Sequence, residues 1–505
     1  MSTPNIKKID FHYKWGLLIT SLLTLILLGI AAWRENVTTE WRIIRQEYAE
    51  ILQEKATDER GQMIADQFET QIVQNYVPKL QVVDRCMTCH PGIDDPRMRN
   101  EEQPYRTHPG TILASHPPEQ FGCTVCHRGQ GRALVFEEAK AEGYHWDYPL
   151  LPVNLTQSSC GQCHSADEVK EQGGEKFALG KELFETKGCY SCHKLNGKGG
   201  SLGPGLDRIG EKVKALLPMA NVKGPHTLAN WLIEHFRDPQ LVVADSQMRP
   251  PQLSEPEIEA LTVYMLAQQE RDFPQTYLSS GKILDIYKES HPDPLSGEEL
   301  FKRYCASCHD TGEYSRYDKF FRKFFPAIRG KTYVQVATAE YLEATIRAGH
   351  PGTLMPAWGQ EAGGLSDGEI VKIREYLQQV EVKPNERLPL EVVQNAKNPA
   401  SVVQGNIMNG ATLFGRHCTS CHTTELAPDL FNPVFQKHAS DGFIAAAIAY
   451  GRLNTAMPGF LGARGGFNEQ EINDLTVFIR AAGKGGTGGP LSEITYSKSP
   501  MMGRN

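Results

Sequence analysis

The sequence predicts a mainly α-helical protein with one N-terminal transmembrane helix, a loop-rich segment that follows it, and three related all-α domains. Three observations lead to this prediction. One uncharged apolar run lies near the N-terminus, one short cysteine pattern occurs six times, and a longer unit built around that pattern recurs three times. A chain of 505 residues is also expected to form several domains.

The apolar run extends from Trp15 to Trp33, with no charge between Lys14 and Arg34. Its length is close to the minimum for crossing a bilayer, and tryptophans at both ends suit the two membrane interfaces. Lysines precede the run, so we expect the N-terminus in the cytoplasm and the rest of the chain on the periplasmic or extracytoplasmic side. The run therefore predicts a single-pass protein of the cytoplasmic membrane.

A cleaved signal peptide is the alternative interpretation of this run. Ala31 and Ala32 are its nearest match to a small-residue cleavage site. The run is longer than a usual signal core, which favours an uncleaved anchor. His12 lies before the run and is expected to be an ordinary cytoplasmic or interfacial residue.

All twelve cysteines fall into six copies of Cys-x-x-Cys-His. Two thioethers to a haem and an imidazole for its iron explain this spacing, because a helical turn places all three groups on one side of the ring. A redox pair or a zinc site would not need a His after every second Cys, and structural disulfides would not repeat one spacing. We therefore expect six covalently bound haem c groups. Their attachment cysteines and proximal histidines are Cys86, Cys89 and His90; Cys123, Cys126 and His127; Cys160, Cys163 and His164; Cys189, Cys192 and His193; Cys305, Cys308 and His309; and Cys418, Cys421 and His422.

The haem motifs and the local composition divide the chain into seven segments. They are a cytoplasmic N-terminus and anchor at 1–33, an amphipathic helical stalk at 34–80, a triheme segment at 81–172, three domains at 173–291, 292–403 and 404–485, and an extended, Gly-rich tail at 486–505. Polar, proline-containing linkers are expected at 271–291 and 383–403.

Apolar residues in the stalk recur at helical spacing, which predicts amphipathic helices. We expect Gly61 to divide the stalk into two helices and Pro78 to end the second. The apolar face either packs on the chain itself or offers a docking surface to a partner subunit. The residues that define this face are Trp41, Ile44, Tyr48, Ile51, Ile64, Phe68 and Ile72.

Each of the three C-terminal domains repeats one order of features. A Gly is followed four residues later by a Phe, then by the haem motif, by a loop with a Met, and by a helix that starts with a capping box or an Asn cap. An Ile and an aromatic residue keep one spacing in that last helix. The residues are Gly180, Phe184, Ser254, Glu257, Ile258 and Tyr264; Gly297, Phe301, Ser366, Glu369, Ile370 and Tyr376; and Gly410, Phe414, Asn468, Glu471, Ile472 and Phe478.

This unit resembles the class I cytochrome c domain over about 173–270, 292–382 and 404–485. The resemblance implies an all-α fold in which the first and last helices cross near the Gly and the aromatic residue. It also implies that a Met in the intervening loop is the distal ligand of the haem iron.

Three methionines are the candidates for this distal position. Met355 and Met457 precede a Pro, as in the family's ligand loop, whereas Met248 is separated from the following prolines by Arg249. Met219 is a rival to Met248 in the first domain. We expect Met248, Met355 and Met457 to be thioether ligands, which raise the reduction potential of a haem.

The triheme segment contains three histidines beyond its proximal ones, namely His108, His116 and His145. Three haems and three additional histidines predict bis-His coordination, which generally leaves the potential lower. Which His serves which haem stays open at this point. The remaining histidines are expected to be structural or surface residues: His226, His235, His291, His350, His417 and His438.

The stretch GCTVCHRGQGR at 122–132 resembles the multihaem c subunits of bacterial quinol-oxidising complexes of the cytochrome bc kind. Such subunits accept electrons from membrane-embedded quinol-oxidising or cytochrome b subunits and pass them to periplasmic electron carriers. The three class I domains also resemble modules fused to such complexes and to terminal oxidases. The resemblance implies an electron-transfer subunit of a respiratory or photosynthetic chain, and the formal charge of −7 gives no basic field for nucleic acid.

Alternative functions remain. A reductase or peroxidase would need one haem with an open distal position, and the predicted ligands fill all six. We therefore expect no catalytic residues. A free-standing anchored conduit for extracellular electron transfer would suit the bis-His segment better than the three Met-ligated domains. A mainly structural role fits poorly with six haem motifs.

Overall fold

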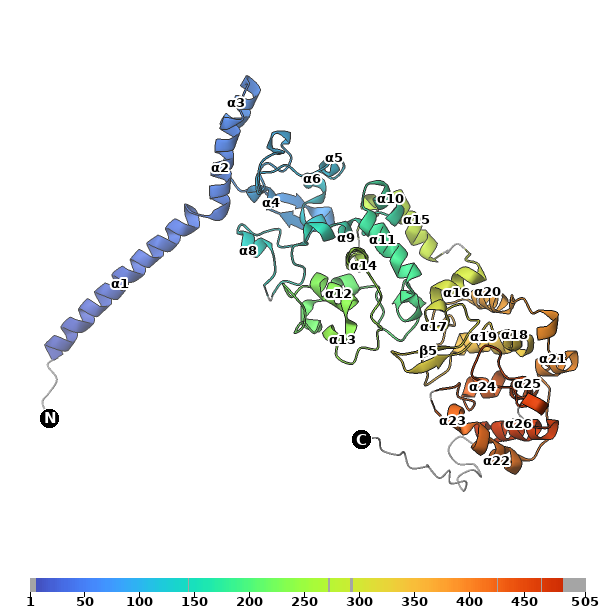
Figure 1. Ribbon diagram of the computed structural model, residues 1–505. Helices are drawn as coiled ribbons and strands as arrows, with labels where there is room; N and C mark the ends of the chain where they lie inside the picture. The colour runs from blue at the N-terminus through green and yellow to red at the C-terminus, as the bar shows by residue number, and fades with distance from the viewer. Residues whose placement is uncertain are drawn as a thin grey trace, which may run out of the picture. The chain divides into compact units, whose positions relative to one another are not determined.

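The computed structural model describes residues 6–143, 145–270, 273–290, 294–424, 426–464 and 466–484. The predicted extended tail at 486–505 and His291 lie outside the described residues. The chain divides by its internal contacts into two units, Met1–Gly174 with Gly210–Glu234 and Arg271–Lys282, and Glu175–Ile209 with His235–Glu270 and Ile283–Asn505. The fold is mainly helical and begins with one apolar helix, which confirms the predicted fold class (Figure 1).

The first 174 residues contain two long helices and many short ones. The α-helices and strands are α1 (Ile6–Asn36), α2 (Glu40–Glu54), α3 (Glu59–Asp66), β1 (Asn75–Val77), β2 (Val82–Asp84), α4 (Cys86–Cys89), α5 (Ile112–Ser115), α6 (Pro118–Phe121), α7 (Thr124–His127), α8 (Phe136–Ala139), α9 (Gln157–Cys160) and α10 (Ala166–Glu171). The 3₁₀ helices are η1 (Pro78–Leu80), η2 (Pro96–Met98) and η3 (Val153–Leu155).

The rest of the chain contains more of the longer helices. The helices and strands between 175 and 290 are α11 (Glu175–Thr186), η4 (Cys189–Ser191), β3 (Lys194–Leu195), β4 (Lys198–Gly199), η5 (Ile209–Glu211), η6 (Lys214–Leu216), α12 (Leu228–Arg237), α13 (Pro239–Val242), α14 (Glu255–Ala267), η7 (Gln275–Tyr277) and α15 (Ser280–Ser290). From 294 onward they are α16 (Gly297–Tyr304), α17 (Ala306–His309), β5 (Arg316–Asp318), β6 (Lys323–Phe325), α18 (Lys331–Val336), α19 (Ala339–Ala348), α20 (Asp367–Gln378), η8 (Pro384–Glu386), α21 (Leu390–Lys397), α22 (Ile407–His417), α23 (Thr419–His422), α24 (Pro433–His438), α25 (Asp441–Tyr450), η9 (Gly462–Arg464) and α26 (Glu469–Lys484).

Helix α1 is long and apolar enough to cross a membrane. Its part Asp10–Asn36, which contains the uncharged run, has 27 residues and is exposed along its length. At a rise of about 1.5 Å per residue it is roughly 40 Å long, which exceeds the hydrocarbon core of a bilayer. This helix is a membrane anchor or a signal sequence.

The stalk differs from the prediction in where its helices end. Asp58 caps α3 by accepting the Gly61 N–H over 2.6 Å, so Gly61 lies inside the first turn of that helix and does not divide the segment. The second helix ends at Asp66, and Pro78 instead follows strand β1, which pairs with β2 in an antiparallel hairpin. The helical part of the stalk is therefore shorter than expected.

The buried face of α2 packs on the chain itself. Trp41, Arg45, Tyr48 and Leu52 are its buried residues, at helical spacing. The Tyr48 ring stands edge-on to Phe68 with centroids 5.2 Å apart. Arg45 donates from Nη2 to the backbone oxygen of residue 69 over 2.8 Å. The α2 part of the predicted face is therefore packed on the chain itself, whereas Ile64 and Ile72, which the prediction placed on the same face, are exposed.

The predicted crossing of the first and last helices is confirmed in all three repeats. A Cβ built on the Gly of the first helix would lie 2.1 Å from a carbonyl oxygen of the last helix in each repeat, so only glycine permits this approach. The repeated order of features also gives three aromatic pairs with centroids 5.2–5.9 Å apart. The Gly and carbonyl residues are Gly180 and Ala260, Gly297 and Lys372, and Gly410 and Asp474.

The predicted caps of the last helices form as well. Ser254 with Glu257 and Ser366 with Glu369 make capping boxes. Asn468 accepts the backbone N–H of residue 471 over 3.0 Å. A hydrophobic core then joins the second and third repeats, with residues from both in one cluster: Val336, Ala337, Tyr341, Leu342, Phe414, Phe443, Ile444 and Phe478 among others. The last two repeats are thus one packed body.

Candidate haem sites

All six Cys-x-x-Cys-His motifs adopt the same closed turn. In each motif the backbone N–H of the His donates to the carbonyl oxygen of the first Cys over 2.9–3.0 Å. No two of the twelve cysteines are joined in a disulfide. This turn keeps both sulfurs and the imidazole close together, as covalent attachment of a haem requires.

The proximal histidines of the three repeats share a hydrogen bond that sequence reasoning missed. Nδ1 of His193, His309 and His422 lies 2.9, 3.2 and 2.9 Å from the carbonyl oxygens of Pro204, Pro326 and Pro428. A carbonyl only accepts, so Nδ1 carries the proton and Nε2 keeps a lone pair for a metal. The three prolines follow their histidines at different distances in the sequence. The one signal in the sequence for this hydrogen bond is therefore that a proline follows each of the three haem motifs.

Burial reinforces the metal-binding form of these imidazoles. It lowers the pKa of His193 and His422, and it lowers the pKa of His309 to about 4. The neutral imidazole, which is the form that binds iron, therefore prevails at neutral pH. These three side chains fit the proximal position of a haem c.

Two of the three predicted distal histidines lie opposite proximal ones. The ring centroids of His108 and His127 are 6.2 Å apart, and those of His116 and His164 are 5.8 Å apart. A metal–imidazole bond of about 2.0 Å on each side, plus the distance from nitrogen to ring centre, gives a separation of roughly 6 Å for two imidazoles on one metal. Both pairs therefore fit bis-His coordination of one iron.

The third predicted distal residue, His145, is exposed on a turn. His90 is the proximal residue left over by the two pairs above, and burial lowers its pKa. The assignment of His145 to the haem of His90 remains a prediction.

The three candidate Met loops share a local structure. The backbone N–H of each Met donates to a hydroxyl two residues earlier, from Ser246, Thr353 or Thr455, over 3.1–3.2 Å. In the last two repeats the Met carbonyl also accepts the N–H of the residue five positions earlier. Met219 instead accepts the Val222 N–H in an ordinary turn. This shared geometry favours Met248 over Met219 as the ligand candidate.

Asp84 is a second residue that sequence reasoning missed. It is 1% exposed, and its carboxylate accepts the backbone N–H groups of Cys123 and Thr124 and the Thr124 hydroxyl, the last over 2.8 Å. A Cβ on Gly131 would lie 2.1 Å from the same carboxylate. Since Cys86 follows two residues after Asp84, this side chain ties the first haem motif to the second.

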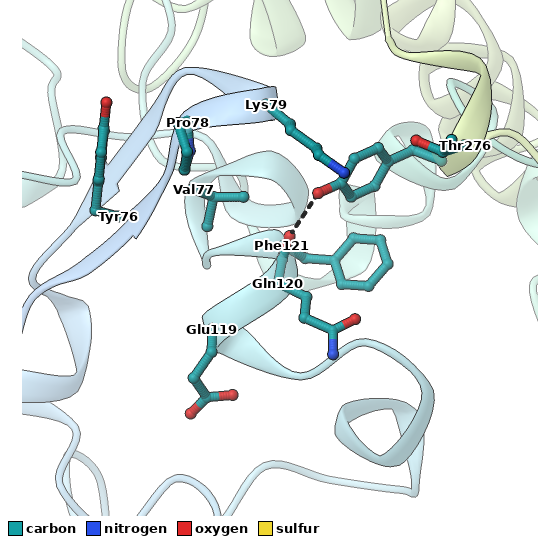
Figure 2. A pocket seen from close by; sticks show the side chains of 9 residues that line it. Tyr76, Val77, Pro78, Lys79, Glu119, Gln120, Phe121 and Thr276 are labelled. Atoms are coloured by element: carbon teal, nitrogen blue, oxygen red, sulfur yellow. Dashed lines mark hydrogen bonds between the residues drawn. The ribbon is translucent and has the colours of Figure 1, made fainter.

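A pocket of about 460 Å³ adjoins the third motif (Figure 2). Figure 2 shows Lys79, Gln120 and Phe121 around it, with the Gln120 carbonyl accepting the hydroxyl of Tyr277 over 3.3 Å. The Phe121 ring lies 4.9 Å from the imidazole of His116. Because Phe121 lines the pocket and its ring lies beside His116, the pocket borders the His116–His164 pair.

Comparison with known proteins places these sites in a family context. Residues 292–377 and 405–479 match the family model for cytochrome c oxidase, cbb3-type, subunit III, and residues 177–269 match that for cytochrome c. Cytochrome c oxidase subunit 2 of Alkalihalophilus pseudofirmus is 30% identical over 120 residues, which are 24% of this chain and 33% of that protein. The chain thus covers about a third of the length of this relative. No solved structure matches.

The matched residues contain the three repeats with their helix crossings, their haem motifs and their Met loops. Cytochrome c domains hold haem c and carry electrons. The chain is therefore a multihaem c-type cytochrome for electron transfer, with cytochrome c domains related to oxidase-associated cytochromes and one N-terminal apolar helix.

Proposed function

We propose that the chain binds six haem c groups and passes electrons from a membrane-embedded quinol-oxidising or cytochrome b subunit to periplasmic carriers. The observation that carries the proposal is the same closed turn at all six motifs, which makes each of them competent for attachment. Helix α1 would anchor the chain with its N-terminus in the cytoplasm and hold the haem sites on the other side.

Two kinds of axial ligand give the chain a direction for electron flow. Haem c, when bound, takes up and releases single electrons. Met248, Met355 and Met457 favour the reduced state, since thioether ligation raises the potential. Paired imidazoles in the first 172 residues leave the potential lower. Electrons that enter on the membrane side would then move downhill toward the three repeats.

The proposed ligands on both axial faces of the haems favour electron transfer over enzymatic activity. The His108–His127 and His116–His164 pairs leave no room for a substrate between their imidazoles. In the repeats the Pro carbonyls fix the imidazole tautomer, and the proposed Met ligands would occupy the opposite axial position. Saturated sites of this kind transfer electrons and do not readily bind substrates.

A second candidate is a subunit that works with a terminal oxidase. The match of 292–377 and 405–479 to a cbb3-type oxidase subunit favours it, as does the likeness to an oxidase subunit 2. Both candidates use the same haem sites, and they differ in the membrane partner.

The test is purification of the full chain from its native membrane in mild detergent, with mass spectrometry of the proteins that accompany it. Co-purification with a cytochrome b or another quinol-oxidising subunit supports the first candidate. Oxidase subunits in place of these support the second. Isolation without any membrane partner contradicts both and favours a free-standing anchored conduit.

A further inference from the structure

Arg249 is the residue that separates Met248 from the prolines of its loop, and it reaches into the next repeat. Its Nη1 lies 3.1 Å from Oδ2 of Asp318 in strand β5. Its Nη2 lies 3.5 Å from the carbonyl oxygen of Ser307, which stands inside the motif Cys305–His309. The loop of one proposed distal ligand thus contacts the attachment turn of the following haem site.

Asp318, the acidic partner in this contact, is buried and held in place by the backbone. It is 6% exposed, and Oδ1 accepts the backbone N–H groups of Phe320 and Phe321 over 3.0 and 3.1 Å. Arg316 approaches the same carboxylate at 3.6 Å and donates to the Ser307 carbonyl over 3.1 Å. Two guanidinium groups share one carboxylate here, so the cluster carries a net positive charge beside the attachment turn.

The fourth and fifth attachment turns also touch each other. A Cβ on Gly188 would lie 2.7 Å from the Cβ of Ser307. Ser191 donates from its hydroxyl to the Tyr304 carbonyl over 3.0 Å, and the rings of Tyr190 and Tyr304 are 5.7 Å apart. The charge of Arg249 therefore lies close to both attachment turns, and because its side chain is 36% exposed, water screens it only in part.

We propose that Arg249 is a positioning and tuning residue that couples the haem sites of His193 and His309 and raises the reduction potential of both. The proposal rests on the proposed haem binding at these motifs. A positive charge favours the reduced iron, which carries one positive charge fewer than the oxidised iron. At an effective dielectric constant of about 20, a unit charge at roughly 10 Å changes a reduction equilibrium about tenfold.

The experiment uses the full haem-loaded chain in detergent and compares Arg249→Gln, Arg249→Lys and Asp318→Asn by redox titration. Arg249→Gln should lower two of the potentials by about tenfold in the reduction equilibrium, or about 59 mV for one electron, and leave the others unchanged. Arg249→Lys should retain most of the shift. Asp318→Asn should raise the same two potentials, which a merely structural role would not do. Arg387→Gln, an exposed arginine, is the control for charge removal.

Two further readouts separate the possible outcomes. The charge-transfer band of Met-ligated ferric haem should persist in Arg249→Gln, which shows that Met248 still binds and the domain is folded. Unchanged potentials in Arg249→Gln, or shifts of the same sign in Arg249→Gln and Asp318→Asn, would overturn the inference alone. A mass that shows no haem on the motifs of His193 and His309 would overturn the proposed function as well.

Discussion

The imidazole rings of His108 and His127 face each other at 6.2 Å between centroids, with their planes inclined by 66°. The two residues are separated by 19 positions in the sequence, and only the fold of the loop-rich segment brings them together. The separation matches two imidazoles on one metal. This pair supports the prediction of His108 as a distal ligand and favours the second haem motif as its site, a choice that the sequence alone left open.

Replacement of His108 by Met should convert one bis-His site into a Met/His site. The potential of one haem should rise, because a thioether ligand stabilises the reduced state. Electron paramagnetic resonance of the oxidised chain should show one bis-His signal fewer, and His226→Met, at an exposed position, should change nothing. An unaltered spectrum in His108→Met would remove His108 from the ligand set.

In α22, replacement of Gly410 at the helix crossing should destabilise the fold, whereas replacement of Gly415 in the same helix should not. Gly410→Ala places a Cβ against the Asp474 carbonyl and should destabilise the fold by about 1–3 kcal/mol. Gly415→Ala meets no atom within 4 Å and should stabilise by up to about 1 kcal/mol. Thermal unfolding of the two variants checks this, and equal effects would argue against the crossing.

Glu369 should contribute a pH-dependent share of stability. Burial alone would raise its pKa, but hydrogen bonds from Lys198, over 2.6 Å, and from Ser366 outweigh burial and lower the pKa. A depressed carboxylate pKa stabilises the fold above the unfolded value of about 4.3, and the stabilisation is lost as pH falls through the lower folded value.

Glu369→Gln should therefore cost about 1–2 kcal/mol at pH 7. The difference from the unmodified chain should shrink as the pH falls below about 4.3. Denaturant unfolding at several pH values measures it, with the exposed Glu361→Gln as the matched control. A cost that stays constant with pH would show that the charge of Glu369 plays no part.

Helix α1 should remain on the mature protein. Its uncharged run from Trp15 to Trp33 is longer than a usual signal core, so an uncleaved anchor is expected. Intact-mass measurement of the protein from its native membrane should include the residues before Trp33. A mature N-terminus just after Ala31 or Ala32 would instead show a cleaved signal sequence.

The repeats could be predicted from the sequence because their determinants are local. Cys-x-x-Cys-His turns, Ser-x-x-Glu caps and the Gly at a helix crossing act within a few residues of each other or recur in fixed order. Gly61 misled the prediction because the side chain of Asp58 supplies a cap that keeps glycine inside α3. Predictions from neighbouring residues were therefore correct except where a nearby side chain formed a hydrogen bond with the backbone, as Asp58 does with Gly61.

Contacts between distant residues could not be predicted in this way. The Pro carbonyls behind the proximal histidines lie 6 to 17 residues away. Asp84 meets Cys123 over 39 positions, and Arg249 meets Asp318 across a domain boundary. Such pairings depend on how loops fold over each other, and hydrophobic periodicity carries no information about that.

A redox titration of the purified full chain, followed by haem absorbance and combined with its intact mass, tests the central claim most directly. The account predicts a mass with six haems and six one-electron steps in two groups, three at low potential from the bis-His sites and three at high potential from the Met/His sites. A single narrow group of potentials, or a mass with fewer than six haems, would contradict it.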